Sequence, residues 1–456
     1  MISQDVRIYS LGIRRDRPKP YTVRWKVGPA PRRQAFITRA LAENFRSDLL
    51  QAARRGEAFD VETGLPESMW PKAETRSFHQ ACLAYVDMKW PGSAGTSRSA
   101  RAQALATAAV CMVDDAAPDR PKDAVLQHAL TKWAYNAKTR DDDKPVEARA
   151  ALAWLEAHSV PISVFAESDT RVRHTRRVLD ACATLQDGAP AAATTSARKR
   201  AVLYNLFGYC VEQGELPTNP IDTVQWKAPH KSEEVDRRVV ASPAQVRELL
   251  TACTYVGRVR GPRLVAFFAL LYFAALRPAE ALALKVTDCE LPEKGWGLLL
   301  LSSSTPEAGR AWTDSGQGRE ERGLKWRGRR AVRPVPIPPE LVRILRHHVD
   351  TFGTGPDGVL FRTAMGRPYA PDTYYRVWQG ARALGMPPGV RVTPVAARPY
   401  DLRHGGVTLW LNSGVPAPEV ARRAGHSVDV LLKIYAGCMD DGTSEANGKI
   451  DKALSS

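Results

Sequence analysis

Apolar and polar positions alternate near the start of the chain in a way that predicts a small sheet. The segment Tyr21–Val27, "YTVRWKV", places apolar side chains on one face and Arg24 and Lys26 on the other. "VRIYSLGIR" and "RQAFIT" predict two more strands, and a helix is expected over residues 39–55. Residues 1–62 are therefore predicted to form a module of three strands and one helix. Its basic face is either a solvated sheet surface or a DNA contact.

Helical periodicity dominates residues 72–214, where apolar side chains recur at the spacing of one helix face. Segments such as "RSFHQACLAYVDMKW" and "ARKRAVLYNLFGYCVEQG" are separated by turn-prone stretches such as "PGSAGTS". Residues 215–238 are charged and contain prolines, a composition typical of a linker between domains. We therefore expect a helical domain and then a linker.

Helices also dominate residues 239–456, with one β interruption. Ser242 suits the N-cap of a helix and Pro243 its first position. The apolar run of 13 residues from Leu264 to Leu276 is shorter than the roughly 20 that span a bilayer, so it predicts a buried helix. "WGLLLLSSS" and "RRAVRPVPIP" predict two strands joined by a long polar excursion. The expected fold is mostly α with small β elements (α+β), the last domain being helical with a β-hairpin.

The charge of the chain narrows the class of partner. Lys and Arg number 65 against 49 Asp and Glu, which gives a net charge of +16. Such an excess favours nucleic acid as the partner, and an anionic membrane surface second; a generally arginine-rich proteome would produce the same excess. The seven cysteines are scattered without a CxxC pair, and the nine histidines form no HExxH motif. We therefore expect no disulfide framework, no metal, no cofactor and no secretory signal, and a cytoplasmic location.

Two segments of the last domain carry cationic side chains that could bind an anion. In "ALRPAEALAL", Arg277 follows the buried helix and Glu280 falls in the first turn of the next one. Arg277 is either a structural ion-pair partner or a clamp on an anionic group. The stretch "RGLKWRGRRAVR" holds Lys325 and many arginines. It is either a solvated hairpin or an element that tracks phosphates.

Two further segments carry histidine and tyrosine. "YDLRHGG" holds Arg403 and His404, and we interpret His404 as a hydrogen-bonded core histidine. In "AGHSVDVLLKIYAG", nine residues separate His426 from Tyr435, about 13 Å along one straight helix, and the two would face opposite ways. With Ser427 as N-cap, the helix would begin after His426. Taken alone, Tyr435 reads as a packing residue.

The order and spacing of these segments resemble the tyrosine recombinase (phage integrase) family. That family has an R-x-x-E segment, a hairpin lysine, an H-x-x-R-H box, an L-G-H-S box and a tyrosine nine residues past its histidine, in this order. Here Arg403 precedes His426 by 23 residues, and His426 precedes Tyr435 by nine. The resemblance covers residues 240–440. By layout, residues 72–214 resemble the family's core-binding domain, and the first 60 residues resemble arm-site-binding modules.

The resemblance implies a role for each residue. Tyr435 would attack a DNA phosphodiester and form a 3′-phosphotyrosine. Arg277 and Arg403 would hold the non-bridging oxygens, and His426 would donate to the same phosphate. Lys325 would act as general acid on the departing 5′ oxygen. These cations would neutralise the phosphate, so the mechanism needs no metal.

The sequence departs from the family pattern at two positions. Tyr400 stands where the first histidine of the H-x-x-R box is usual; it can donate a hydrogen bond but is not a cation at neutral pH. Ala275 replaces a usual glycine upstream of Arg277, with no expected chemical cost. Lys325 is assigned because it is the sole lysine between Lys294 and Lys433.

The resemblance therefore implies a site-specific recombinase of a prophage or other mobile element. Its expected partners are double-stranded DNA attachment sites, three further copies in a homotetramer assembled on DNA, and accessory directionality or DNA-bending proteins, with no membrane. The tail after Tyr435 is expected to dock on a neighbouring copy. Two alternatives stay open: a type IB topoisomerase-like strand transferase, and a catalytically silent DNA-binding regulator with the same fold.

Overall fold

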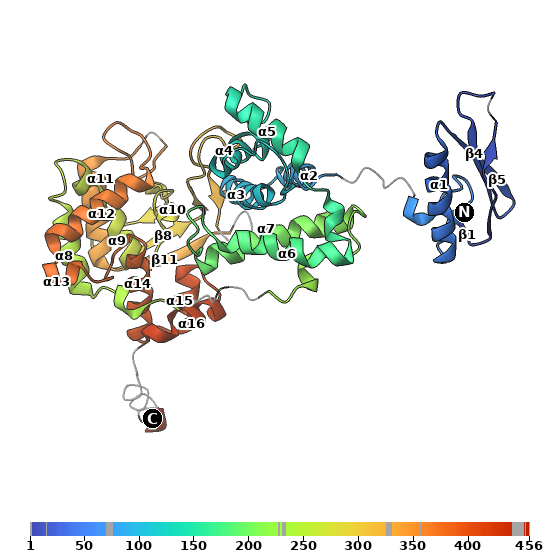
Figure 1. The fold of residues 1–456 in the computed structure, drawn as a ribbon. Coiled ribbons are helices and arrows are strands. Elements are labelled where there is room, and N and C mark those ends of the chain that lie inside the picture. Colours follow the sequence, from blue (N-terminus) through green and yellow to red (C-terminus); the bar gives the residue numbers. More distant parts are fainter. Residues whose placement is uncertain are drawn as a thin grey trace. The chain divides into compact units, whose positions relative to one another are not determined.

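The computed structural model describes residues 2–14, 16–69, 76–226, 229, 234–324, 331–355, 357–439, 451 and 453–455. The chain forms two compact units, Met1–Arg76 and Ser77–Ser456. Helices make up most of the second unit, and the strands form small sheets, which confirms the predicted fold class (Figure 1). In the described part of the chain, no helix has both the length and the apolar character that a membrane crossing requires.

The first unit is an antiparallel sheet covered by one helix. Its central strand β4 pairs with β5 on one side and with both β2 and β3 on the other. The main sheet has four strands where three were expected, because residues 9–11 interrupt the ladder and divide the first stretch into β2 and β3; β1 and β6 form a further pair. The elements are β1 (Ile2–Ser3), β2 (Val6–Ile8), β3 (Gly12–Ile13), β4 (Tyr21–Val27), β5 (Ala30–Phe36), α1 (Arg39–Arg54) and β6 (Phe59–Asp60), with β1 paired to β6.

The alternation predicted for β4 is confirmed. Val23, Trp25 and Val27 are buried and form a core with Leu49 of α1. The intervening Arg24 and Lys26 are exposed on the opposite face. Because strand side chains alternate between faces, the hydrophobic set fixes which face of the sheet α1 covers.

Residues 77–223, called the helical module below, pack around their own hydrophobic core. Phe78, Phe165 and Phe207 lie at its centre, with ring centroids 4.7 to 6.3 Å apart. The module contains α2 (Phe78–Lys89), α3 (Gly95–Cys111), α4 (Asp123–Ala129), the π-helical turn η2 (Leu130–Ala134), α5 (Val146–His158), α6 (Ser168–Ala183) and α7 (Ala193–Glu212). The predicted linker, 215–238, includes residues 227, 228 and 230–233, which lie outside the described residues.

Residues 239–439, called the C-terminal module below, combine helices with the predicted hairpin. The strands are β7 (Cys289–Glu290), β8 (Gly297–Leu301), β9 (Ser303–Ser304), β10 (Arg322–Gly323) and β11 (Arg333–Ile337), with β8 between β11 and β7, and β9 paired to β10. The helices are α8 (Pro243–Cys253), α9 (Arg260–Phe273), α10 (Pro278–Ala281), α11 (Pro339–Phe352), α12 (Pro371–Gly385), α13 (Pro388–Arg391), α14 (Asp401–Asn412), α15 (Ala417–Ala424) and α16 (Val428–Tyr435). Ser242 caps α8, as predicted.

The buried helix α9 and helix α14 approach each other closely. A Cβ atom at Gly406 would lie 2.0 Å from the Tyr272 carbonyl oxygen, so only glycine permits this contact. The approach brings the first turn of α14 to the end of α9. There Ala275 has φ +47°, a left-handed conformation that costs a non-glycine residue about 1–2 kcal/mol. Alanine in place of the usual glycine therefore has a backbone cost, which the sequence alone did not indicate.

Candidate active site

The C-terminal module brings four of the five candidate residues into one cluster. Arg277 is the N-cap of α10, and Arg403 lies in the first turn of α14. His426 lies between α15 and α16, and Tyr435 is the last residue of α16. Figure 1 shows α14, α15 and α16 gathered at one side of the module. The fifth candidate, Lys325, lies outside the described residues.

The geometry of the "AGHS" segment explains how His426 and Tyr435 come to share one site. Helix α15 ends at Ala424, and its C-cap Gly425 has φ +69° and leaves no room for a Cβ beside the Arg333 guanidinium. The Ser427 hydroxyl then accepts a hydrogen bond from the Val430 N–H at 3.3 Å, so α16 begins after His426 as predicted. The His426 and Tyr435 rings lie 6.2 Å apart, centroid to centroid, at an interplanar angle of 27°.

Arg403 is the most enclosed cation of the cluster, with 0% of its surface exposed. It donates to the carbonyl oxygens of Ala275 and Ala424 and to Nε2 of His426, the last at 2.7 Å. Its Nε–H has no partner among the described residues. Burial, and then the charge of Arg277, lower the pKa of Arg403. This buried donor is therefore unsatisfied in the free protein.

His426 is held neutral in the free protein. Burial, and then the charges of Arg403 and Arg277, lower its pKa to about 3. Because Nε2 accepts from Arg403, the ring proton belongs on Nδ1. Within the described residues Nδ1 is buried and has no hydrogen-bond partner. His426 therefore presents one unused donor, as a role in holding a phosphate requires.

A buried carboxylate orients the remaining arginine. Glu280 accepts from the Arg277 guanidinium at 2.8 Å, and both Glu280 oxygens accept from Arg333, at 3.0 and 2.8 Å. Burial raises the pKa of Glu280, but the charges of Arg333, Arg277 and Arg403 outweigh it and lower the pKa to about 2. Arg277 also donates to the Gly425 carbonyl oxygen at 2.9 Å, and 23% of its side chain is exposed. The ion-pair reading of Arg277 is thus correct, and exposure leaves it accessible to an anion as well.

The structure adds His404, which sequence reasoning had treated as a core residue. Its Nδ1 lies 3.0 Å from the Tyr435 hydroxyl, and its ring meets the Tyr400 ring edge-on. Burial lowers the pKa of His404 to about 4 and raises that of Tyr435, so both groups are neutral at pH 7. The sequence contained an indication of this role. His404 directly follows Arg403, and tyrosine occupies position 400, where a histidine is usual. Arg333 was missed because its partner Glu280 lies 53 residues away.

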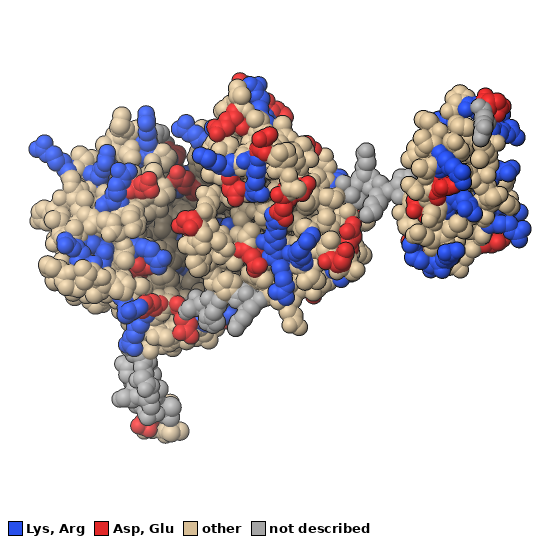
Figure 2. Space-filling model, viewed as in Figure 1, with Lys and Arg blue, Asp and Glu red and all other residues tan. Residues whose placement is uncertain are grey.

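A second basic surface lies on the sheet of the first unit. Arg7 pairs directly opposite Lys26, and Arg24 opposite Arg33, so four exposed cations share the face that α1 does not cover. Among the described residues, no ion pair joins any of the four to an acidic side chain. Figure 2 shows Lys and Arg outnumbering Asp and Glu on the visible side of this unit. Directly opposed like charges destabilise a sheet, so the arrangement suits an anionic partner.

The sequence of residues 240–440 matches the Phage integrase family. Residues 240–440 therefore carry a domain of this family, and relatives that the chain resembles include tyrosine recombinases.

Individual relatives agree with this placement. Over 253 residues, the chain is 26% identical to the tyrosine recombinase XerC of Herpetosiphon aurantiacus, covering 55% of this chain and 71% of that protein. Over 130 residues, it is 25% identical to the integrase of Mycobacterium phage L5, covering 27% of this chain and 33% of that protein. The chain thus spans about a third of the phage relative's length.

Among solved structures, part of the chain matches an integrase of the transposon Tn1549 in complex with transposon right end DNA. The two chains are 17% identical, the similarity covers 69% of this chain and 95% of that one, and the TM-score is 0.46.

Proposed function

We propose that this chain is a site-specific DNA recombinase that cleaves and rejoins duplex DNA at attachment sites of a mobile element. The contact of Tyr435 with His404, beside Arg403 and His426, is the observation that carries the proposal. A tyrosine hydroxyl next to permanent cations suits attack on a phosphate. The same cations stabilise both the phosphate anion and the negative charge that develops on the phenol oxygen.

In the proposed reaction, the Tyr435 oxygen attacks phosphorus and forms a 3′-phosphotyrosine. The bond from phosphorus to the 5′ oxygen breaks, and Lys325 gives that oxygen a proton. Arg277 and Arg403 hold the non-bridging oxygens, and His426 adds the donor on Nδ1. The 5′ hydroxyl of a second strand then attacks the phosphotyrosine, which frees Tyr435 and seals the new junction.

We assign to His404 the role of accepting the Tyr435 proton. The neutral ring offers its lone pair on Nδ1, within hydrogen-bond reach of the phenol. In the free protein the phenol keeps its proton, because burial raises the pKa of Tyr435. A bound phosphate brings negative charge to the cluster, which raises the pKa of His404 and favours the transfer. His404 thus takes over a function for which Tyr400 has no basic nitrogen.

Replacing His404 with alanine is expected to slow covalent complex formation by about 10²–10⁴-fold, the usual loss for a general base. His404→Gln is the matched variant, because its amide can hydrogen-bond to the phenol but cannot take the proton. Single-turnover rates at saturating DNA, measured between about pH 5.5 and 8.5, should show both variants slow and less dependent on pH. If His404→Gln cleaves at the wild-type rate, His404 does not accept the proton and only holds Tyr435 in place.

The proposal extends to the other parts of the chain. Residues 72–214 would be the core-binding domain, 215–238 the linker, and 239–456 the catalytic domain. Together they would clamp the duplex, with four copies assembled at two recombining sites. The tail after Tyr435 would dock on a neighbouring copy; residues 440–450 of this tail lie outside the described residues. Accessory directionality or DNA-bending proteins would complete the assembly.

The basic face of residues 1–62 is proposed to contact DNA phosphates at arm-type sites. Replacing Arg24 and Lys26 with alanine should reduce the slope of log affinity against log salt by about two, since each phosphate contact contributes about 0.9. The control replaces Arg39 and Arg55 with alanine. This removes the same amount of charge, but both arginines are paired to glutamates within the unit. Equal slopes for the two double variants would contradict the proposed contact.

The proposed function is tested by incubating the protein with labelled DNA that carries the boundary of its mobile element, and then denaturing the mixture. A recombinase leaves a DNA band retarded by covalently attached protein, sensitive to protease. A silent regulator binds the same DNA without this band. A topoisomerase-like enzyme relaxes supercoils on any plasmid and forms the band without preference for the boundary sequence.

A further inference from the structure

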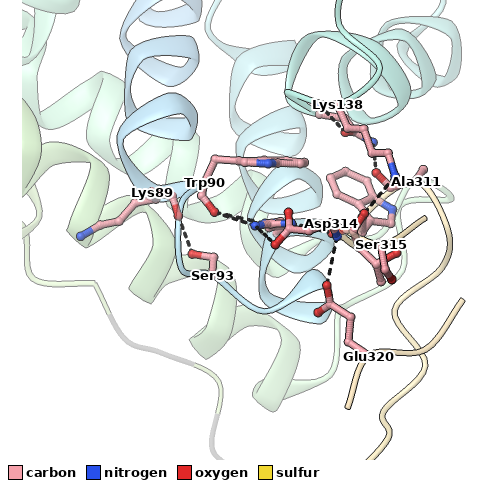
Figure 3. A network of polar contacts seen from close by, with 12 residues as sticks. Lys89, Trp90, Ser93, Lys138, Ala311, Asp314, Ser315 and Glu320 are labelled. Carbon is pink, nitrogen blue, oxygen red and sulfur yellow. Dashed lines mark hydrogen bonds and ion pairs between the residues drawn. The ribbon is translucent and has the colours of Figure 1, made fainter. Parts of the chain in front are cut away.

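The excursion between β9 and β10, residues 305–321, contacts the helical module and is called the strap below. It leaves the small sheet of the C-terminal module and packs against α3 and the turn before it (Figure 3). Gly95, the first residue of α3, marks how close the packing is. A Cβ atom there would lie 2.7 Å from the Ala308 Cβ and 3.1 Å from the Trp312 carbonyl oxygen.

Arg98 of α3 is the centre of this contact. It is 3% exposed and donates to both carboxylate oxygens of Asp314, at 2.6 and 3.2 Å. The same guanidinium donates to the carbonyl oxygens of Trp90 and Trp312, each at 3.0 Å, and lies over the Trp90 ring. One buried cation thus joins a turn of the helical module to two residues of the strap. A planar guanidinium suits such a junction, because its donors have a fixed geometry.

Two more residues of the helical module hold the strap from the other side. The Asn136 amide donates to the Ala311 carbonyl oxygen at 3.1 Å, and the Lys138 ammonium to that of Thr313 at 3.0 Å. Figure 3 shows Lys138 and Ala311 on one side of Asp314, with Trp90 and Ser93 on the other. The strap backbone is therefore held at several consecutive residues rather than by a single ion pair.

The strap is in turn joined to the strand that precedes Lys325. The Asp314 N–H donates to Glu320 at 3.0 Å, and Glu320 accepts from Arg322 of β10 at 2.7 Å. Arg322 itself donates to the Ser93 carbonyl oxygen of the helical module at 3.3 Å. Leu324 is buried in the core of the C-terminal module and is the residue directly before Lys325. The described chain thus connects Arg98 to within one residue of the proposed general acid.

We propose that Arg98 is a positioning residue for the general acid: through Asp314 and the strap, the helical module holds β10 and Leu324, the last described residue before Lys325. This inference rests on the proposed function, in which Lys325 protonates the 5′ oxygen as the bond to phosphorus breaks. Cleavage then requires that the helical module and the C-terminal module keep the relative position that these contacts define. DNA gripped by both modules would favour that arrangement, so general acid catalysis would be coupled to complete binding.

The chemistry of the leaving group provides a selective test. When sulfur replaces the bridging 5′ oxygen, the departing thiolate is stable without a proton, and the general acid is no longer needed. A defect that acts through Lys325 is therefore corrected by a 5′-bridging phosphorothiolate substrate. A defect in DNA binding, in folding or in the nucleophile is not corrected, because the attack on phosphorus still needs bound DNA, a folded protein and the Tyr435 oxygen.

The primary variant is Asp314→Ala, because the Asp314 side chain is 72% exposed and Arg98 keeps its hydrogen bonds to the Trp90 and Trp312 carbonyl oxygens. The matched control is Asp115→Ala. Asp115 is 75% exposed and pairs with Arg177 at 2.6 Å, the same length as the Arg98–Asp314 pair, but that pair lies wholly within the helical module. A second variant, Gly95→Leu, displaces the strap by bulk without removing a charge. Single-turnover covalent complex formation is measured with full-length protein at saturating DNA.

Asp314→Ala and Gly95→Leu should each slow cleavage of ordinary DNA by about tenfold or more, and cleave the phosphorothiolate within about twofold of the wild-type rate. Asp115→Ala should match the wild type on both substrates. Lys325→Ala should show the same selective rescue, and adding Asp314→Ala to it should cause no further loss. Equal slowing on both substrates, or none on either, overturns the inference. A wild-type protein that forms no covalent complex with either substrate overturns the proposed function instead.

Discussion

Tyr435→Phe is expected to abolish covalent attachment to DNA, with a loss of more than about 10⁴-fold, while leaving DNA affinity nearly unchanged. The substitution removes one oxygen atom, which is the proposed nucleophile. It also removes the hydrogen bond to His404, at a cost of about 1 kcal/mol in folding stability, so the variant should fold. The measurement compares the retarded band on denaturing gels with the affinity from a native binding titration.

The control for this variant is Tyr400→Phe. Tyr400 is the other tyrosine next to His404, and at 37% exposed it is more accessible than Tyr435, which is 1% exposed. Its loss should leave covalent attachment in place. If the Tyr400 variant loses attachment and the Tyr435 variant keeps it, the nucleophile has been assigned to the wrong residue.

Glu280→Gln is expected to reduce the free energy of unfolding by about 3–5 kcal/mol, the usual cost of removing one partner of a buried ion pair. Glu280 and Arg333 are both almost completely buried, so the substitution leaves a buried guanidinium without a counter-charge. Arg277 loses its orienting partner at the same time. Denaturant unfolding measures the first effect, and the rate of covalent attachment measures the second.

Glu340→Gln provides the matched control, because it removes a surface pair with Arg247 and should cost less than about 1 kcal/mol. The pH dependence gives an independent check. The pKa of Glu280 is lowered from 4.5 to about 2, so its stabilising effect is present above pH 4.5 and is lost as the pH falls toward 2. The stability difference between Glu280→Gln and the wild type should shrink over that range. A constant difference would mean that the Glu280 charge is not responsible.

The sequence was most informative where function restricts local geometry. The start of α16 could be predicted because His426 and Tyr435 can share one phosphate only if the helix begins between them, and Ser427 supplies the cap. The buried helix α9 and the alternation of β4 followed from hydrophobic period alone. These features depend on residues that are close together in the sequence, and periodicity and capping act over the same short distance along the chain.

Long-range contacts could not be predicted in the same way. Arg98 and Asp314 are 216 residues apart, and neither lies in a motif that would single it out. The buried Glu280–Arg333 pair is 53 residues apart, and the basic stretch that holds Arg333 reads as solvated until the fold encloses it. The interruption that separates β2 from β3 lies in an alternation that reads as continuous. In each case the deciding interaction is with a distant part of the chain.

The central claim, that Tyr435 joins the chain to DNA through a 3′ phosphate, is tested most directly by identifying the linked residue. A covalent complex trapped on attachment-site DNA is digested with protease and nuclease, and the nucleotide-bearing peptide is sequenced by mass spectrometry. We predict a single adduct on Tyr435, attached through a 3′ phosphate, and a free 5′ hydroxyl on the other side of the nick. An adduct on any other residue, or a linkage through a 5′ phosphate, would contradict the account.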